Sequence, residues 1–117
     1  KQNIDVLLSP CFALPAMLHD DGVDLIPAAS YSFLHNLVGG PAGMVPWSII
    51  GEGEESDRER VRDSVVRKAI ATETGSAGLP VGVQVAALPW QEHLVLAVMR
   101  KLEEAIPRSQ KEGRSEQ

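Results

Sequence analysis

The chain has 117 residues, of which 44% are hydrophobic and 23% are charged, and this composition excludes a disordered, collagen-like or fibrous protein. Its 16 acidic and 11 basic residues give a net charge of −5, which disfavours a nucleic-acid-binding surface because such a surface needs clustered Lys and Arg. With a single cysteine, Cys11, the chain cannot form an internal disulfide. No apolar run approaches the roughly 20 residues that span a bilayer, and no signal peptide is recognisable, so we expect any membrane anchor to lie outside this sequence.

The first part of the chain predicts a strand followed by a long loop. The apolar run at 4–8 ends at Ser9 and Pro10, and its short, β-branched composition is typical of a buried strand. Because this strand begins so near residue 1, we expect further sequence to precede it. Residues 10–27 contain three prolines, Gly22 and three aspartates, which disfavour regular structure and predict a loop.

The middle of the chain predicts a helix and an irregular strand. Apolar residues at helical spacing follow Pro27, which suits a first helical turn, and they predict a helix over about 27–38 that the following glycines end. Residues 43–50 predict a strand. Since Pro46 has no N–H to donate, it must lie at an edge, at a bulge or at an unpaired position.

The last third predicts a second helix, a third strand and a third helix. Ser56 and Glu59 have the spacing of a capping box and predict a helix over about 57–72. Valines alternate with smaller or polar residues and predict a strand over about 80–87. A helix then extends from Pro89 until Pro107 stops it.

The residues capable of catalysis or metal binding form no local pattern. His19, His35 and His93 lie far apart, and no second cysteine or carboxylate completes a metal-ligand spacing, so we expect these histidines at the surface or at helix ends. Cys11 has no local His, Asn or Asp partner, which favours a small loop hydrophobe over a thiol nucleophile. The residues alone therefore predict neither a catalytic group nor a metal site.

Two other polar features receive structural interpretations. Gln84 lies on an otherwise apolar strand and must be hydrogen-bonded if it is buried, which favours a structural amide over a substrate contact. Adjacent acidic residues near a predicted helix start are more typical of a solvated turn than of a cation site. These acidic residues are Glu52, Glu54, Glu55 and Asp57.

Several short segments resemble the C-terminal part of amidase-signature enzymes, most closely the animal fatty-acid amide hydrolases. They occur in the family's order and cover about residues 1–107. The segments are Asn3-Ile-Asp-Val-Leu-Leu-Ser-Pro10, Ser30-Tyr-Ser-Phe-Leu-His-Asn36, Pro41-Ala-Gly-Met-Val-Pro46, Gly78-Leu-Pro-Val-Gly-Val-Gln84 and Ala87-Leu-Pro-Trp-Gln-Glu92.

The resemblance implies an α/β fold, a mixed β-sheet flanked by helices, of which about three strands and three helices fall within this chain. Residues 1–107 would be the C-terminal portion of an amidase-signature domain, and 108–117 a polar, disordered tail. The family hydrolyses amides with a Ser-Ser-Lys triad that lies upstream of this segment. This chain contains no Gly/Ser-rich signature, so no catalytic residue is assigned and we expect the chain alone to be inactive. The family implies no cofactor and no metal.

The resemblance also implies which side chains line the channel for the substrate's acyl tail. The family's helix maps onto Ile26, Ala29 and Phe33, and its inserted segment between the last two strands maps onto Val61 and Val65. The first three are spaced at i, i+3 and i+7, so they share one helix face. The same spacing also describes an ordinary core face. Channel and core therefore both stay open for these residues.

The sequence thus leaves two functional interpretations. The first is the C-terminal segment of a fatty-acid amide hydrolase-like serine hydrolase, which would act on a fatty acid amide only together with upstream sequence. The second is a non-catalytic truncated product or interaction module. For the first, the resemblance implies an intracellular, endomembrane-associated enzyme and a homodimer. No nucleic acid is expected as a partner, and no span of a membrane is expected in this chain.

Overall fold

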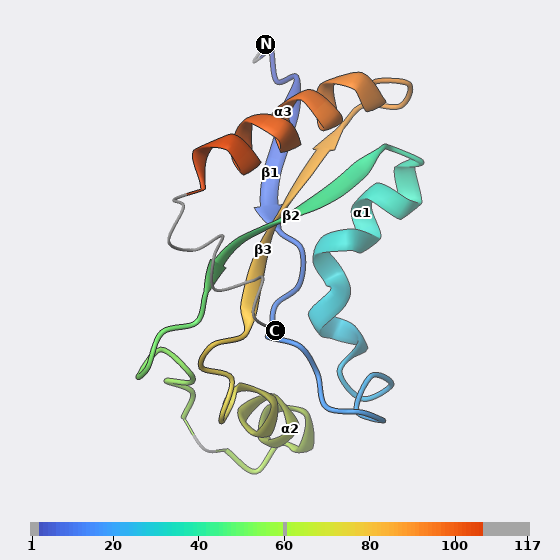
Figure 1. Cartoon of the computed structure of the whole chain (residues 1–117). Helices are drawn as coiled ribbons and strands as arrows, with labels where there is room; N and C mark the ends of the chain where they lie inside the picture. The colour runs from blue at the N-terminus through green and yellow to red at the C-terminus, as the bar shows by residue number, and fades with distance from the viewer. Residues whose placement is uncertain (1–2, 60, 107–117) are drawn as a thin grey trace.

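Three strands form the centre of the structure (Figure 1). The computed structural model describes residues 3–59 and 61–106, so the predicted tail at 108–117 lies outside the described residues. The strands are β1 (Val6–Pro10), β2 (Ala42–Ile49) and β3 (Pro80–Ala87), and they lie in the order β1-β3-β2. Both pairs are antiparallel. The three predicted strands are confirmed, and the second and third are antiparallel neighbours.

A bulge in β2 accommodates its proline. Pro46 lies opposite Gly82, but the next pair is Ser48 with Val81, so Trp47 is an extra residue in the ladder. A proline cannot donate to a ladder and is tolerated at edges and bulges. Since β2 is an edge strand of the described sheet, Pro46 meets two of the three conditions that the sequence allowed, the edge and the bulge.

Helices connect and cover these strands. The 3₁₀ helix η1 (Ile26–Ala29) continues directly into α1 (Ser30–Val38), α2 (Ser64–Glu73) lies in the connection between β2 and β3, and α3 (Glu92–Ala105) follows β3. The predicted single helix at 27–38 is therefore two helical segments of different pitch. Gly39 ends α1 in the left-handed conformation (φ 64°), as its sequence predicts.

α1 and α3 lie on opposite faces of the sheet. The amide of Gln84 reaches the backbone of Tyr31 in α1. A Cβ at Gly43, which pairs with Val85, would instead meet Met99 of α3. Since consecutive residues of a strand point to opposite faces, α1 and α3 cover different sides. The result is an α/β arrangement in which both described strand pairs are antiparallel. The described residues contain no parallel pair of the mixed sheet that the family resemblance implies.

Two helix starts differ from the sequence prediction. α2 begins at Ser64 rather than near residue 57, and its cap is Asp63, whose carboxylate accepts hydrogen bonds from the N–H groups of Val65 (2.7 Å) and Val66 (3.0 Å). The predicted capping box is wrong because the Ser56 hydroxyl donates elsewhere. α3 begins at Glu92, since Trp90 has a positive φ (70°) and a turn precedes the helix.

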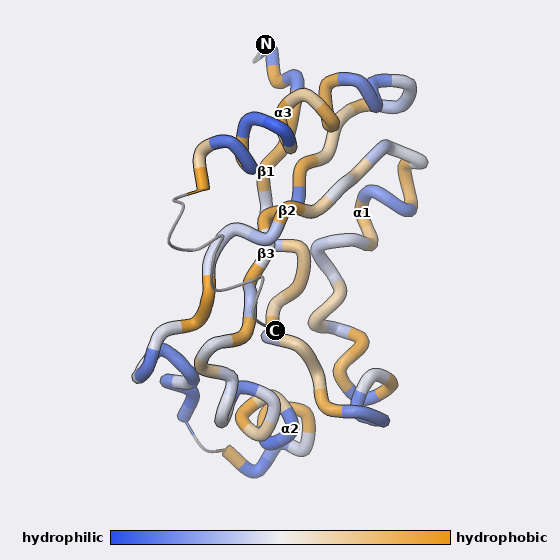
Figure 2. The backbone as a smooth tube through the Cα atoms, viewed as in Figure 1, coloured by the Kyte–Doolittle hydropathy of each residue, from blue (hydrophilic) through white to orange (hydrophobic). Residues whose placement is uncertain are grey.

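The buried apolar side chains lie on both faces of the sheet and on the segments that cover it. They are Leu25, Ala28, Val45, Ala69, Val85, Ala86, Val95 and Ile106. Figure 2 shows hydrophilic residues concentrated in the connection that follows β2. None of the described helices is both long enough and apolar enough to cross a membrane.

Candidate functional site

η1 and the start of α1 carry the first three predicted channel residues. Ile26 and Ala29 lie three residues apart in a 3₁₀ turn, which places them on one side of it. Phe33 follows four residues later, one α-helical turn further along. Ile26 is 51% exposed and Phe33 is 48% exposed, while Ala29 is partly buried. Within the described part of the chain, these side chains therefore form an accessible apolar line.

Buried neighbours fix this line in place. Leu25, immediately before Ile26, is almost fully buried, and Ala28 is buried between Ile26 and Ala29. The carbonyl oxygen of Ala28 accepts a hydrogen bond from the N–H of Ala13 (2.9 Å), which ties η1 to the loop after β1. The apolar line is thus exposed although its backbone is anchored.

The other two predicted channel residues lie at the start of α2. Val65 is in the first turn of the helix and is 42% exposed, whereas Val61 precedes the helix and is 45% exposed. The prediction that both lie on one helix is wrong for Val61, because Asp63 caps α2 two residues after it. Both side chains are nevertheless accessible and apolar.

One ion cluster joins α2 to the loop that precedes η1. The ammonium group of Lys68 donates hydrogen bonds to Asp21 Oδ1 and to Asp24 Oδ2, each at 2.6 Å. We name these three residues the Lys68 cluster. It links the segment that leads into Ile26 with the helix that carries Val65, so the two groups of predicted channel residues lie on segments that are bonded to each other.

The cluster alters the pKa of its lysine. Hydrogen bonds to Asp21 and then to Asp24 raise the pKa of the Lys68 ammonium above its ordinary value of 10.5. Because the folded pKa is the higher one, the contribution of this proton to stability is fully present at neutral pH and is lost as the pH rises through the raised pKa. The Lys68 ammonium group is therefore protonated under physiological conditions.

Two apolar grooves lie elsewhere on the molecule. The β1–α1 groove, of about 210 Å³, lies between β1, the end of β3 and α1. Its lining residues are Ile4, Asp5, Val6, Leu7, Leu34, His35, Val38, Ala86, Ala87 and Leu88. The five predicted channel residues do not line it. Leu34 and Val38 are four residues apart, so they share one face of α1, and this spacing could have indicated the groove from the sequence. The residues predicted to line the acyl channel do not include them.

The second groove, of about 390 Å³, lies between the loop after β1 and the paired strands β2 and β3. The Cys11 thiol lines it and donates to the carbonyl oxygen of Gly82 (3.7 Å), not to a histidine. Its other lining residues are Pro10, Phe12, Leu14, Pro15, Ala16, Met17, Met44, Pro80, Val81 and Gly82. The five predicted channel residues do not line this groove either.

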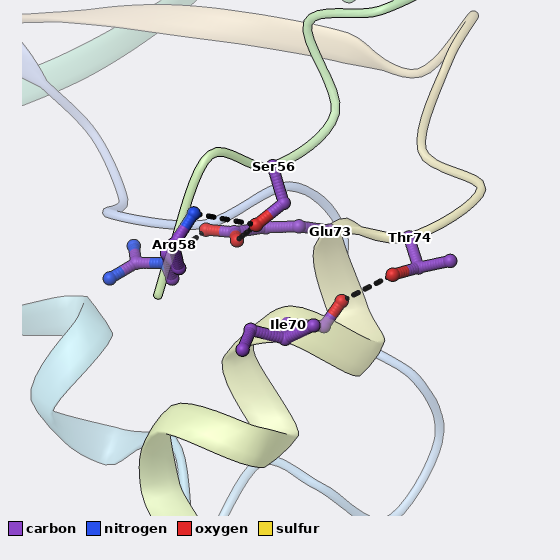
Figure 3. Close-up of polar contacts among 5 residues, drawn as sticks. All are labelled: Ser56, Arg58, Ile70, Glu73 and Thr74. Carbon is purple, nitrogen blue, oxygen red and sulfur yellow. Dashed lines mark hydrogen bonds and ion pairs between the residues drawn. The ribbon is translucent and has the colours of Figure 1, made fainter. Parts of the chain in front are cut away.

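A cluster of polar side chains joins the connection between β2 and α2 to the last residue of α2 (Figure 3). The carboxylate of Glu73, whose side chain is 9% exposed, accepts hydrogen bonds from Ser56 Oγ (2.5 Å) and Arg58 Nε (2.6 Å). Glu54 and Glu55 accept from the backbone N–H groups of Gly51 and Gly75. The acidic run thus organises a loop, and among the described residues no group of His, Cys, Asp or Glu side chains is arranged to hold a metal ion.

Two further interpretations from the sequence concern a glutamine and a histidine that are both buried. Gln84 is buried, and its amide donates to Ser9 Oγ (3.4 Å) and to the carbonyl oxygen of Tyr31 (3.3 Å), which confirms a structural amide. His35 is buried, and it lies in the last turn of α1, so the expectation of a surface or helix-end position is confirmed for it as a helix end. It lines the β1–α1 groove.

Comparison with known proteins places the chain in a family. A family model described as Amidase matches residues 1–96. The chain therefore belongs to the amidase family, as the sequence segments indicated.

Within that family the chain is similar to fatty acid amide hydrolases. It is 36% identical over 115 residues to fatty acid amide hydrolase 1 of Caenorhabditis elegans, covering 91% of this chain and 19% of that protein. It is 38% identical over 108 residues to fatty-acid amide hydrolase 1 of Sus scrofa, covering 86% of this chain and 18% of that protein. The chain thus spans about a fifth of the length of the curated relatives it matches.

Proposed function

We propose that this chain supplies part of the acyl-binding wall of a fatty-acid amide hydrolase-like serine hydrolase, which converts long-chain fatty acid amides to fatty acid and amine. The observation that carries the proposal is an accessible line of apolar side chains, Ile26, Ala29 and Phe33, on an anchored backbone. The similarity to two fatty acid amide hydrolases supports the choice of substrate class.

Such a line suits the tail of a fatty amide. Each methylene that leaves water for an apolar surface contributes about 0.8 kcal/mol, so a long acyl chain gains several kcal/mol from a continuous apolar wall. Since the backbone of η1 is already held by Leu25 and Ala28, little ordering is needed when an alkyl chain covers Ile26 and Phe33. The chain's role in the proposal is binding, and cleavage is assigned to the family's Ser-Ser-Lys triad.

The family resemblance extends the proposal to location and assembly. A complete enzyme carrying this chain would be intracellular, associated with endomembranes and homodimeric. Fractionation of cell membranes and measurement of the molecular mass in mild detergent test these two points separately from substrate binding.

Replacing Phe33 with Asp in the complete enzyme tests the binding role. The variant places a charge where the alkyl chain should lie, and removing that charge from water is strongly unfavourable. We expect kcat/KM for the primary amide of oleic acid to fall by about tenfold or more, equivalent to at least about 1.4 kcal/mol. Turnover of the primary amide of butyric acid should stay near the wild-type value, because its short tail does not reach Phe33.

Phe33→Leu is the matched control, since it keeps an apolar side chain at the same place and should retain turnover of the long amide. A packing-only role for Phe33 gives a different result: Phe33→Asp would lower both activities equally and reduce the melting temperature. That result, or a complete enzyme with no amidase activity, would refute the proposed function.

A further inference from the structure

The Lys68 cluster connects two segments that are far apart in the sequence. Lys68 is separated by 47 residues from Asp21 and by 44 residues from Asp24. Its ammonium group lies between two carboxylates, and each of them comes from the short segment just before η1. The cluster is therefore a tertiary link and not a local helix contact.

On the loop side, backbone hydrogen bonds connect Asp21 to η1. The N–H of Leu25 donates to the carbonyl oxygen of Asp21 (3.1 Å), and the N–H of Ala28 donates to that of Leu25 (2.9 Å). Asp21, Leu25 and Ala28 thus form a continuous series of turns. This series of backbone hydrogen bonds therefore connects Asp21 to the segment that carries Ile26 and Ala29.

On the helix side, Lys68 lies one turn from Val65, the predicted channel residue in α2. Val65 and Lys68 are three residues apart in α2, so their side chains are neighbours on the helix surface. The sheet strands and α3 pack extensively against one another, whereas α2 is absent from the larger packed pairs of elements. The position of α2 relative to η1 depends correspondingly more on polar links such as the Lys68 cluster.

We infer that Lys68 is a positioning residue. It sets the separation between the apolar residues of η1 and α1 (Ile26, Ala29 and Phe33) and those at the start of α2 (Val61 and Val65), and thereby the preference for long acyl chains. The inference rests on the proposed function. Lys68 does not touch the substrate in this account. It acts by holding Asp21 and Asp24, and with them the apolar side chains of both segments.

The energy of the Lys68 cluster determines whether its loss should affect global stability or only the local structure. An ion cluster that is partly exposed contributes little to global stability, because water screens its charges. Its loss should therefore loosen the two segments without unfolding the protein. Selectivity for acyl length is a more sensitive readout than the melting temperature.

The test compares Lys68→Met, Lys68→Arg and Lys101→Met in the complete enzyme. Lys68→Met keeps the length of the side chain and removes its charge, whereas Lys68→Arg keeps a cation that can bond to both aspartates. Lys101→Met is the matched control, because Lys101 also pairs with a carboxylate, Glu104, but within α3 alone.

Two measurements are made on each variant. The first is the ratio of kcat/KM for the amide of oleic acid to that for the amide of butyric acid. The second is hydrogen exchange of the backbone over residues 17–25 and 61–68, which reports local opening independently of activity. For Lys68→Met we expect the ratio to fall by about fivefold, the upper size for losing one exposed ion cluster, and exchange to rise in both segments. Lys68→Arg should recover most of the ratio, and Lys101→Met should change neither measurement.

The possible results separate the two proposals. Unchanged exchange and an unchanged ratio in Lys68→Met would overturn the positioning role while leaving the proposed function intact. Equal losses for both substrates with a lower melting temperature would also overturn it, in favour of a purely structural role. If the wild-type enzyme shows no long-chain amidase activity, the proposed function fails and the inference about acyl preference is overturned with it; the exchange data then report only whether Lys68 joins the two segments.

Discussion

The carboxylate of Glu73 shows how a single residue can determine the structure of a loop. It is nearly buried at the end of α2, and it accepts hydrogen bonds from Ser56 and Arg58 of the preceding connection. A buried charge is tolerated only when partners satisfy it. Glu73 therefore holds the 51–59 connection against α2, and Figure 3 shows the two donors converging on it.

Removing the cation from this cluster should cost stability. Arg58→Ala leaves the Glu73 carboxylate buried with one fewer charge-assisted hydrogen bond, and we expect the free energy of unfolding to fall by about 2 kcal/mol. The double variant Arg58→Ala/Glu73→Gln should recover part of this loss, because a neutral amide is less costly to leave without a cation. Urea unfolding of the complete protein measures both, and a double variant no more stable than Arg58→Ala would contradict the account.

At this scale the sequence predicts buried polar groups better than it predicts their partners. An amide on an apolar strand has to find donors or acceptors, which is why Gln84 could be interpreted correctly. Lys68 and its two aspartates carry no such signal, since charged residues in a loop and on a helix are ordinarily solvated. Only the fold brings the ammonium group of Lys68 to 2.6 Å from a carboxylate oxygen of each aspartate.

Among the elements, α2 departs most from its sequence prediction. Ser56 and Glu59 have the spacing of a capping box, but the Ser56 hydroxyl is used by Glu73, which lies 17 residues away. Asp63 is free to cap the helix instead, and its negative charge is favourable at a helix N-terminus. A tertiary hydrogen bond thus overrides a local motif.

The strands could be predicted because their local sequence patterns are sufficient to specify them. Alternation of valine with smaller residues specifies β3, because a half-buried sheet surface requires that period. The chemistry of proline limited Pro46 to an edge, a bulge or an unpaired position, and the structure places it beside a bulge in an edge strand. Local chemistry is sufficient wherever no distant side chain competes for the same group.

The cap of α2 gives a direct test. Asp63→Ala should lower the free energy of unfolding by about 1 kcal/mol, because the N–H groups of Val65 and Val66 lose their acceptor. Glu59→Ala should change it by less than about 0.5 kcal/mol, since Glu59 is exposed and lies before the helix. Thermal unfolding measures both variants. A larger loss for Glu59→Ala than for Asp63→Ala would restore the capping box.

For the whole molecule, the most consequential property is the amount of apolar surface that remains exposed. Large hydrophobic side chains are accessible on β1, on α1 and after β3. They include Leu7, Leu8, Leu34, Leu37, Val38, Leu88 and Trp90. Both β1 and β2 are also edge strands of the described sheet. Extensive exposed apolar surface and open strand edges favour association.

We therefore expect the 117-residue chain to self-associate when it is produced alone. Light scattering should detect species larger than a monomer, and an environment-sensitive apolar dye should bind. Leu8→Lys places a charge on the exposed edge strand β1 and should reduce association, because natural edge strands use lysine in this way. A monomeric wild-type chain that melts cooperatively and binds no dye would refute the expectation.

The position of α2 between two paired strands also has an evolutionary consequence. The register of β2 and β3 is set by their own ladder, which continues through the bulge to the pair Ile49 and Pro80. Backbone hydrogen bonds between Ile50 and the pair Gly78 and Leu79 close the ladder, so for the sheet residues 51–77 are one connection. Each doubling of the length of a connection costs only about 0.6 kcal/mol, so this segment can be lengthened, shortened or replaced while the strands on either side stay in register. A surface that contacts substrates can vary most easily when it lies on such a connection, because changes there leave the sheet intact.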